Sequence, residues 1–163
     1  MMMQHVFYQE GPGWVVLESL DGGFLTGIRF CRDIPAVDVA ETNSFLKDVE
    51  TILRRFFKGG RPDFSQIPLA PQGTLFQQAV WQVLRKIPYG ETRSYQWVAQ
   101  QLGKPDASRA VGQANGKNPI PVIIPCHRVV NHDGSLGGYS GGLDIKRYLL
   151  GLEGAGYTMA MAL

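Results

Sequence analysis

Two cysteines, Cys31 and Cys126, are the candidate nucleophiles of this sequence. Cys126 is followed directly by His127 and Arg128, and no carboxylate stands near it in sequence. Cationic neighbours lower the pKa of a thiol and raise the fraction of thiolate, which is the reactive form. The pattern therefore predicts that Cys126 is a reactive nucleophile. Cys31 follows an apolar run, and we expect it to pack in the core.

His127 is the candidate base for Cys126, but the side chains of adjacent residues point apart in both strands and helices. A contact between the two therefore requires a turn or a bridging water molecule. The second ring nitrogen of the imidazole also needs an orienting partner. Three carboxylates follow in the sequence, and the residues alone do not choose among Asp133, Asp144 and Glu153.

The segment before Cys126 contains three prolines within residues 118–125. Proline excludes a helix there, and it keeps the residue before it extended. We therefore expect a rigid, extended strap that holds Cys126 in a fixed place. A glycine-rich loop over residues 134–142 follows the cysteine, and a final helix is predicted over residues 143–152.

Three more helices are predicted upstream of this strap, over residues 75–86, 95–102 and 107–115. A residue that can cap a helix stands at the start of each, namely Thr74, Ser94 and Asp106. The second and third are short and closely joined, as in a helix-turn-helix, although a plain helical hairpin has the same spacing. The first helix is expected to bury Phe76, Ala79, Val80, Val83 and Leu84.

The first 70 residues predict a different kind of unit. Three antiparallel strands are expected over residues 5–9, 14–20 and 24–30, with a tight turn at Asp21-Gly22-Gly23 between the last two. A helix over residues 42–58 is expected to cover their apolar face with Phe45, Val49, Ile52, Leu53 and Phe56. Residues 61–72 carry three prolines and are interpreted as the connection to the second unit.

The sequence thus predicts an α+β fold with two domains. Residues 1–70 would form a structural domain, a three-stranded antiparallel sheet with a covering helix, and residues 71–163 a mainly helical, winged-helix-like domain. The first holds seven basic and nine acidic residues and the second nine basic and five acidic, so their net charges are −2 and +4. Residues 107–132 contain no acidic residue, and such a basic segment favours a phosphate-bearing partner.

Composition excludes several classes of protein. Hydrophobic residues make up 44% and charged residues 18% of the chain, as in globular proteins. No apolar run approaches the roughly 20 residues that span a bilayer, and the first residues do not resemble a secretion signal. We therefore expect a cytoplasmic protein without a membrane partner. No Cys-x-x-Cys or His-x-x-x-His pair is present, so no metal site is predicted.

The segment Pro125-Cys126-His127-Arg128-Val129, set between Asn118-Pro119 and Gly138-Tyr139-Ser140-Gly141-Gly142, resembles the O6-alkylguanine-DNA alkyltransferase family. This family is also called the methylated-DNA–protein-cysteine methyltransferases. The resemblance runs in the correct order over residues 73–154, whereas the first 70 residues match only in general character. The other matching segments are Ile87-Pro88-Tyr89-Gly90-Glu91, Ser94-Tyr95, Arg109-Ala110-Val111-Gly112, Leu149-Leu150 and Glu153-Gly154.

The resemblance implies roles for the matching residues. Cys126 would accept the alkyl group, and His127 would act as a base through a water molecule while Glu153 holds its ring. Tyr95 would donate a hydrogen bond to the guanine ring, and Asn118 would hold the turn that joins the recognition helix to the strap. These five residues are the expected catalytic set.

The resemblance also implies how the substrate is held. The target base would be flipped out of the duplex, and Arg109 would fill the gap. Ser140 would lie near O6 of the guanine, and the main-chain carbonyls of Cys126 and Val129 would accept from its exocyclic amine. The expected DNA contacts are Arg109, Ala107, Ser108, Gly112, Gln113 and Asn115, and the expected pocket residues are Val129, Tyr139, Ser140 and Gly141.

The implied function is repair of double-stranded DNA that contains O6-alkylguanine, by a monomer, without a cofactor and once per molecule, because the thioether product has no good leaving group. The main alternative is a protein that binds alkylated guanine without repairing it. A transcription regulator that uses the helix-turn-helix and a cysteine hydrolase with a Cys–His pair are further alternatives. The presence of Cys126 favours the catalytic interpretation.

Overall fold

A computed structural model describes residues 2–36 and 43–156 of the chain, so the predicted helix start at Thr42 lies outside the described residues. The chain divides into two compact units, residues 1–72 and 73–163, close to the boundary expected after residue 70. None of the helices in the described ranges is long and apolar enough to cross a membrane.

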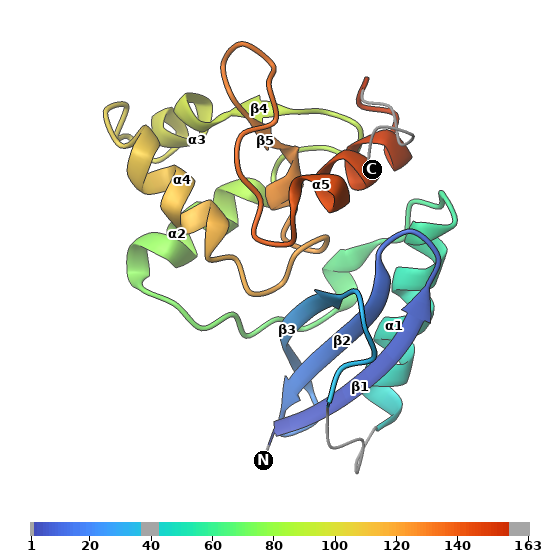
Figure 1. The fold of residues 1–163 in the computed structure, drawn as a ribbon. Coiled ribbons are helices and arrows are strands. Elements are labelled where there is room, and N and C mark those ends of the chain that lie inside the picture. The colour runs from blue at the N-terminus through green and yellow to red at the C-terminus, as the bar shows by residue number, and fades with distance from the viewer. Residues whose placement is uncertain (1, 37–42, 157–163) are drawn as a thin grey trace. The chain divides into compact units, whose positions relative to one another are not determined.

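The first unit is a three-stranded antiparallel sheet with one helix against it (Figure 1). Strands β1 (Met2–Gln9), β2 (Gly13–Leu20) and β3 (Phe24–Cys31) lie side by side in this order. Val6 pairs with Val16 and Leu17 with Ile28, and the register shifts once after Glu18. The central strand is the best buried, because β1 and β3 flank it on both sides. The predicted strands are thus present, with β1 beginning three residues earlier.

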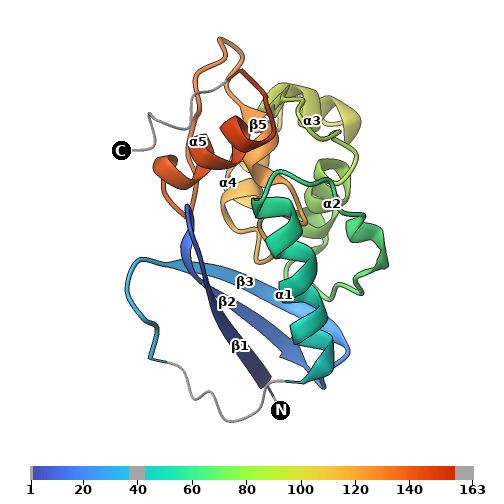
Figure 2. The same ribbon diagram turned by 90° about the vertical axis from the view of Figure 1, so that its right-hand side faces the viewer.

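Helix α1 (Ser44–Phe57) covers the sheet, as Figure 2 shows. Asn43 caps it by accepting from the Leu46 amide, and it ends at Lys58, before the positive φ of Gly59. Of the apolar face predicted for this helix, Phe45 and Ile52 are only partly buried. Leu46 and Phe57, which were not predicted, are buried instead. The buried residues are Leu46, Val49, Leu53, Phe56 and Phe57.

Two further expectations for this unit need correction. Cys31 is half-buried rather than in the core, because it ends β3. The proline-rich segment is more than a connection, since Leu25 of β3 donates to the Pro68 carbonyl and accepts from the Ala70 amide, both at 2.9 Å. This parallel bridge, which follows the short turn η1 (Phe64–Gln66), pairs part of the exposed edge of β3.

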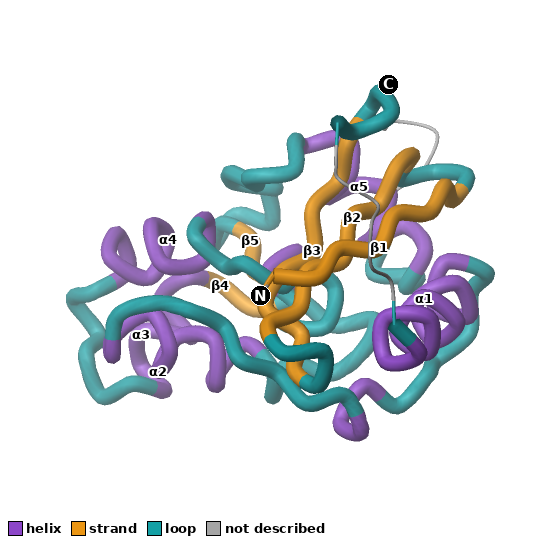
Figure 3. The backbone as a smooth tube through the Cα atoms, turned by 90° about the horizontal axis from the view of Figure 1, so that it is seen from below, coloured by secondary structure: helices purple, strands orange, loops and turns teal. Residues whose placement is uncertain are grey.

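The second unit is built on three packed helices, α2 (Leu75–Leu84), α3 (Tyr95–Gln101) and α4 (Ser108–Gly116), which lie together in Figures 1 and 3. Thr74 caps α2 in a reciprocal capping box with Gln77, and Ser94 caps α3. The third predicted cap was wrong. Asp106 does not cap α4. A turn from Lys104 to Ala107 moves the start of the helix one residue further along the chain, so Ala107 occupies the N-cap position and supplies no side-chain cap.

The buried face of α2 also differs from the predicted one. Ala79 is exposed and Phe76 only partly buried, whereas Trp81 is buried and donates from its indole nitrogen to the Ala114 carbonyl at 3.0 Å. This bond ties α2 to α4 inside the core. The packing of α3 beside α4 follows the helix-turn-helix spacing expected from the sequence.

The remaining elements of this unit flank the strap, residues 118–125, and the chain that follows it. The short strands β4 (Arg93–Ser94) and β5 (Val129–Val130) pair in parallel, and the last helix is α5 (Leu143–Leu152). Residues 118–125 contain no helix, but they are not extended as expected. The Ile124 amide donates to the Ile120 carbonyl at 2.9 Å, and Val122 has a φ of 75°, so the prolines shape a series of turns.

Candidate active site

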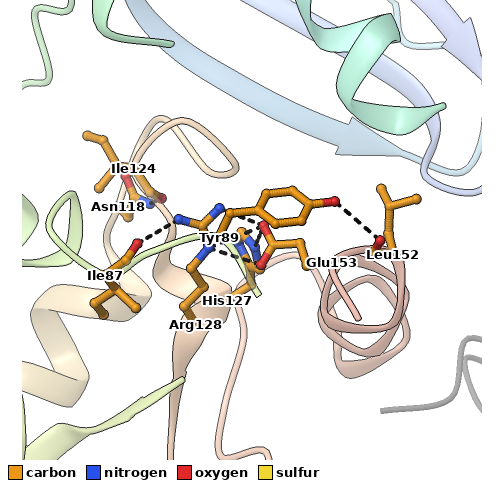
Figure 4. Close-up of polar contacts among 8 residues, drawn as sticks. All are labelled: Ile87, Tyr89, Asn118, Ile124, His127, Arg128, Leu152 and Glu153. Atoms are coloured by element: carbon orange, nitrogen blue, oxygen red, sulfur yellow. Dashed lines mark hydrogen bonds and ion pairs between the residues drawn. The ribbon is translucent and has the colours of Figure 1, made fainter. Parts of the chain in front are cut away.

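The turns before Cys126 are closed by one buried side chain. Asn118 donates from its amide to the Ile124 carbonyl at 2.7 Å (Figure 4). Its side-chain oxygen accepts from the Ile120 amide at 3.0 Å. Residues 120–124 are buried, so these two bonds satisfy polar groups that water does not reach. Asn118 therefore holds the turns between α4 and Cys126 in place.

Cys126 lies in a single 3-10 turn, η2 (Cys126–Arg128), which leads directly into β5. Because β5 pairs with β4, and β4 runs straight into α3, this small sheet brings Tyr95 to the side of the cysteine segment. Asn115 of α4 adds a second link, since its amide donates to the Cys126 carbonyl at 3.3 Å. The start of α3 and the side chain of Asn115 thus both meet the segment that contains Cys126.

His127 is fully buried, and its partner is Glu153. The His127 Nε2 and Glu153 Oε1 atoms are 2.9 Å apart, whereas Asp133 accepts from Ser135 at the surface. Burial alone raises the pKa of Glu153, but the hydrogen bonds and charges of His127 and Arg128 outweigh it and hold that pKa at about 2. Of the three carboxylates left open by the sequence, the structure selects Glu153.

The protonation of His127 follows from its surroundings. Burial lowers the pKa of His127, and although Glu153 opposes this effect, the ring is neutral near pH 7. An ionised carboxylate only accepts hydrogen bonds, so the proton lies on Nε2. The other nitrogen, Nδ1, is buried and has no hydrogen-bond partner among the described residues. It is therefore the basic lone pair of this site.

Arg128 does not activate the thiol as predicted. Its guanidinium donates to Glu153 at 2.7 Å and 3.0 Å and to the Ile87 carbonyl at 2.8 Å (Figure 4). Burial raises the pKa of Cys126, and the opposing effects come from Asn118, Lys146 and Tyr139 rather than from Arg128. At rest the site therefore holds a protonated thiol that needs a base, which corrects the expectation of a lowered thiol pKa.

A cavity of about 670 Å³ opens beside this site. It lies between the start of α3, the exposed side of α4 and the loop that follows β5. Cys126 is 1% exposed and does not line it. Tyr95 and Tyr139 both line this cavity. Burial raises the pKa of each phenol, and a thiolate at Cys126 would raise both further, so both rings lie near the thiol. The Tyr139 hydroxyl is buried, and it has no hydrogen-bond partner among the described residues.

The predicted DNA contacts and pocket residues, together with Tyr95, fall into two groups. The cavity is lined by Tyr95, Ser108, Arg109, Gly112, Gln113, Asn115 and Tyr139. It is not lined by Ala107, Val129, Ser140 or Gly141. Arg109 and Gln113 are exposed, as a contact with DNA requires, but Asn115 is only 3% exposed. Because Asn115 bonds the Cys126 carbonyl, it belongs to the support of the site rather than to its DNA-facing surface.

Lys146 is the main residue that the sequence reasoning missed. It is fully buried on α5, and its ammonium donates to the carbonyls of Val129 at 2.7 Å, Gly138 at 3.1 Å and Leu136. A signal was present, since Lys146 falls at helical spacing with Leu149 and Leu150 on the apolar face of the predicted last helix. A charged residue in such a place marks a buried partner.

Comparison with known proteins agrees with this geometry. Residues 75–155 match the family model described as 6-O-methylguanine DNA methyltransferase, DNA binding domain. The methylated-DNA–protein-cysteine methyltransferase of Methanosarcina acetivorans is 41% identical over 157 residues, which are 94% of this chain and 99% of that protein. The chain belongs to the methylated-DNA–protein-cysteine methyltransferase family. The resemblance inferred from the sequence is thus confirmed.

Two further relatives of the family show how far the likeness extends. The methylated-DNA–protein-cysteine methyltransferase of Haemophilus influenzae is 41% identical over 155 residues, covering 93% of this chain and 86% of that protein. The crystal structure of Mycobacterium tuberculosis OGT in complex with DNA has a TM-score of 0.85 at 38% identity and covers 98% of both chains. The family likeness therefore includes both units, and the predicted α+β fold is confirmed.

Proposed function

We propose that this protein repairs double-stranded DNA by moving the alkyl group of O6-alkylguanine onto Cys126. One observation carries the proposal: the buried, neutral His127 is held through Nε2 by the ionised Glu153, and it shares a turn with the buried thiol of Cys126. Its basic Nδ1 has no hydrogen-bond partner among residues 2–36 and 43–156. A base, a nucleophile and an orienting acid in one chain are what alkyl transfer to sulfur requires.

The proposed step begins with the thiol proton. A water molecule passes it from Cys126 to His127 Nδ1, and Glu153 stabilises the imidazolium that forms. The thiolate attacks the alkyl carbon, so the S–C bond forms while the C–O6 bond breaks and its electron pair goes to O6. Tyr95 donates a hydrogen bond to the guanine ring, which favours departure of the base. The product is a thioether, and we propose that each molecule reacts once without a cofactor.

The proposed DNA contacts lie on α4 and its start. Ala107, Ser108, Gly112 and Gln113 would meet the duplex, and the exposed Arg109 at the cavity would occupy the gap of the extruded base. Asn118 would keep this helix and the thiol in register. All of these residues belong to one chain, so we propose that a monomer acts on the lesion.

Of the predicted pocket residues, Tyr139 alone lines the cavity, so the proposed pocket uses Tyr139 as one wall and main-chain carbonyls as another. The carbonyls of Cys126 and Val129 would accept from the exocyclic amine of guanine. The Val129 carbonyl accepts from Lys146 and has a second lone pair that can accept from a ligand. The Cys126 carbonyl already accepts from Asn115 and from the Val129 amide, so a ligand would have to share it with these donors.

Counting the methyl groups transferred tests this proposal against its alternatives. With duplex O6-methylguanine in excess, repaired guanine is expected to level off at one equivalent per protein molecule. A protein that only binds the lesion would give none, and a hydrolase would exceed one equivalent. Either of these outcomes contradicts the proposal.

Arg109→Ala is expected to slow repair of the lesion in duplex DNA by about 10-fold or more, because flipping a base costs a few kcal/mol and the side chain offsets part of that cost. Reaction with free O6-benzylguanine needs no flipping and should change little. The measurement is the second-order rate constant on each substrate. Equal losses on both substrates would show that Arg109 does not act in base extrusion.

Gly137→Ala is expected to slow alkylation of Cys126 by about 10- to 100-fold, because small displacements in a site have effects of that size. A Cβ at Gly137 would lie 2.6 Å from the Tyr95 hydroxyl oxygen, so this side chain must shift. Gly134→Ala is the matched control, since Gly134 also has a positive φ but open space around it. Similar rates for the two variants would mean that backbone strain, and not the place of Tyr95, causes the loss.

A further inference from the structure

Lys146 makes three hydrogen bonds inside the second unit although its side chain is fully buried. The ammonium donates to the carbonyls of Val129, Leu136 and Gly138, which uses all three of its donors. Burying a charge is unfavourable unless polar groups replace the water that it loses. Three carbonyls on one nitrogen meet that requirement, so the position of each carbonyl is tied to the position of Lys146.

The three carbonyls come from two different parts of the site. Val129 follows η2 directly and is three residues from Cys126. Leu136 and Gly138 flank Gly137, which lies in the cavity wall against the Tyr95 hydroxyl. One ammonium therefore joins the reactive segment to the wall of the cavity. Along the chain, the two parts are joined by the exposed residues 131–135, and Val130 and Leu136 also pack in one small buried cluster. Among the hydrogen bonds of the described residues, those of Lys146 link the Val129 carbonyl to this wall.

We propose that Lys146 is a positioning residue for guanine recognition. It holds the Val129 carbonyl at a fixed distance from the cavity wall formed by residues 136–138. In this position the Val129 carbonyl accepts a hydrogen bond from the exocyclic amine of the base. The inference rests on the proposed function and extends it to a residue outside the Cys126, His127 and Glu153 relay. Lys146 donates to one lone pair of the Val129 carbonyl oxygen at 2.7 Å. This hydrogen bond also fixes the orientation of the carbonyl, and therefore the direction of its second lone pair.

The charge of Lys146 acts on the reactive residue, which supports a role in the site beyond stabilising the fold. Arg128 is neutralised by Glu153, whereas the charge of Lys146 acts on Cys126 and opposes the rise that burial causes in the pKa of the thiol. A purely structural lysine would stabilise the fold without affecting which base the pocket prefers. Base preference is therefore the property that separates the two roles.

Lys146→Met tests the proposal, because methionine fills similar space without donating. The rates of methyl transfer are measured on two duplexes that contain O6-methylguanine or O6-methylhypoxanthine, which differ only in the exocyclic amine. The preference of the wild-type protein for the guanine lesion is expected to fall by about tenfold in the variant, the factor that corresponds to one hydrogen bond. Lys86→Met, at an exposed lysine just after α2, should keep the wild-type preference.

The outcomes are separable. If both rates fall but their ratio is unchanged, Lys146 is only structural and the proposal is wrong. If Lys146→Met does not fold, the ratio is measured on Lys146→Arg, which keeps the cation but cannot bring planar donors onto three carbonyls that converge on one atom, and the same loss of preference is expected. If the wild-type protein transfers no methyl group, the proposed function fails instead.

Discussion

Cys126→Ala is expected to abolish methyl transfer while binding of the lesion-containing duplex stays close to that of the wild-type protein. The thiol is the only atom group in the proposed step that forms a bond to the alkyl carbon, so nothing replaces it. Binding should persist because Cys126 is 1% exposed and does not line the cavity. Loss of one buried sulfur should lower the free energy of unfolding by only about 1 kcal/mol.

Two measurements on matched variants check this expectation. Transfer is followed by loss of the lesion from the duplex, and binding by titration of the same duplex at fixed salt. Cys31→Ala is the control, since Cys31 is half-buried in the other unit and should leave both properties unchanged. Residual transfer by the Cys126 variant, or its loss in the Cys31 variant, would place the acceptor elsewhere.

Glu153→Gln is expected to have the largest combined effect on stability and rate. The carboxylate holds two buried groups, His127 at 2.9 Å and Arg128 at 2.7 Å. Removing one partner of a buried ion pair typically costs about 3–5 kcal/mol, because the remaining charge is left unpaired. The amide also fails to stabilise the imidazolium, so transfer should slow by about 100-fold or more.

Denaturant unfolding and single-turnover rates measure the two effects. Glu91→Gln removes an exposed ion pair with Arg93 in the same unit and should cost less than about 1 kcal/mol. If the two variants lose equal stability, the buried network does not hold the site together. If transfer by the Glu153 variant stays at the wild-type rate, the carboxylate does not act through His127.

The stabilisation that Glu153 provides is expected to decrease as the pH falls. The pKa of Glu153 is held at about 2 in the folded chain against an ordinary 4.5, so its contribution is fully present above pH 4.5 and is lost as the pH falls toward 2. The gap in unfolding free energy between the wild type and Glu153→Gln should therefore narrow by about 3 kcal/mol over that range. A constant gap would contradict the assigned ion pairs.

Much of the scaffold could be predicted from local sequence signals. Thr74 and Ser94 cap α2 and α3 as expected, and the turn residues between the strands fall where the hairpins need them. These features depend on neighbours within a few residues. Asp106 failed because a turn at Lys104 competes for the same residues, and such competition is decided by geometry rather than by residue type.

The reactive residue of the site could be predicted from the sequence, but the partners of its charged side chains could not. Cys126 and His127 are adjacent, but Glu153 lies 26 residues after His127, so only the fold or the family likeness selects it over Asp133. Arg128 looked like an activator because a sequence shows its charge and not its partner. Asn115 and Lys146 were missed as supports for the same reason, since each acts on a main-chain carbonyl that carries no sequence signal.

The central claim is that Cys126 itself accepts the alkyl group. The most direct measurement is the intact mass of the protein after incubation with duplex O6-methylguanine, followed by mapping of the modified peptide. We expect a gain of one methyl group, located on Cys126, together with one lost lesion per molecule. An unchanged mass in folded protein, or a methyl group on Cys31, would contradict this account.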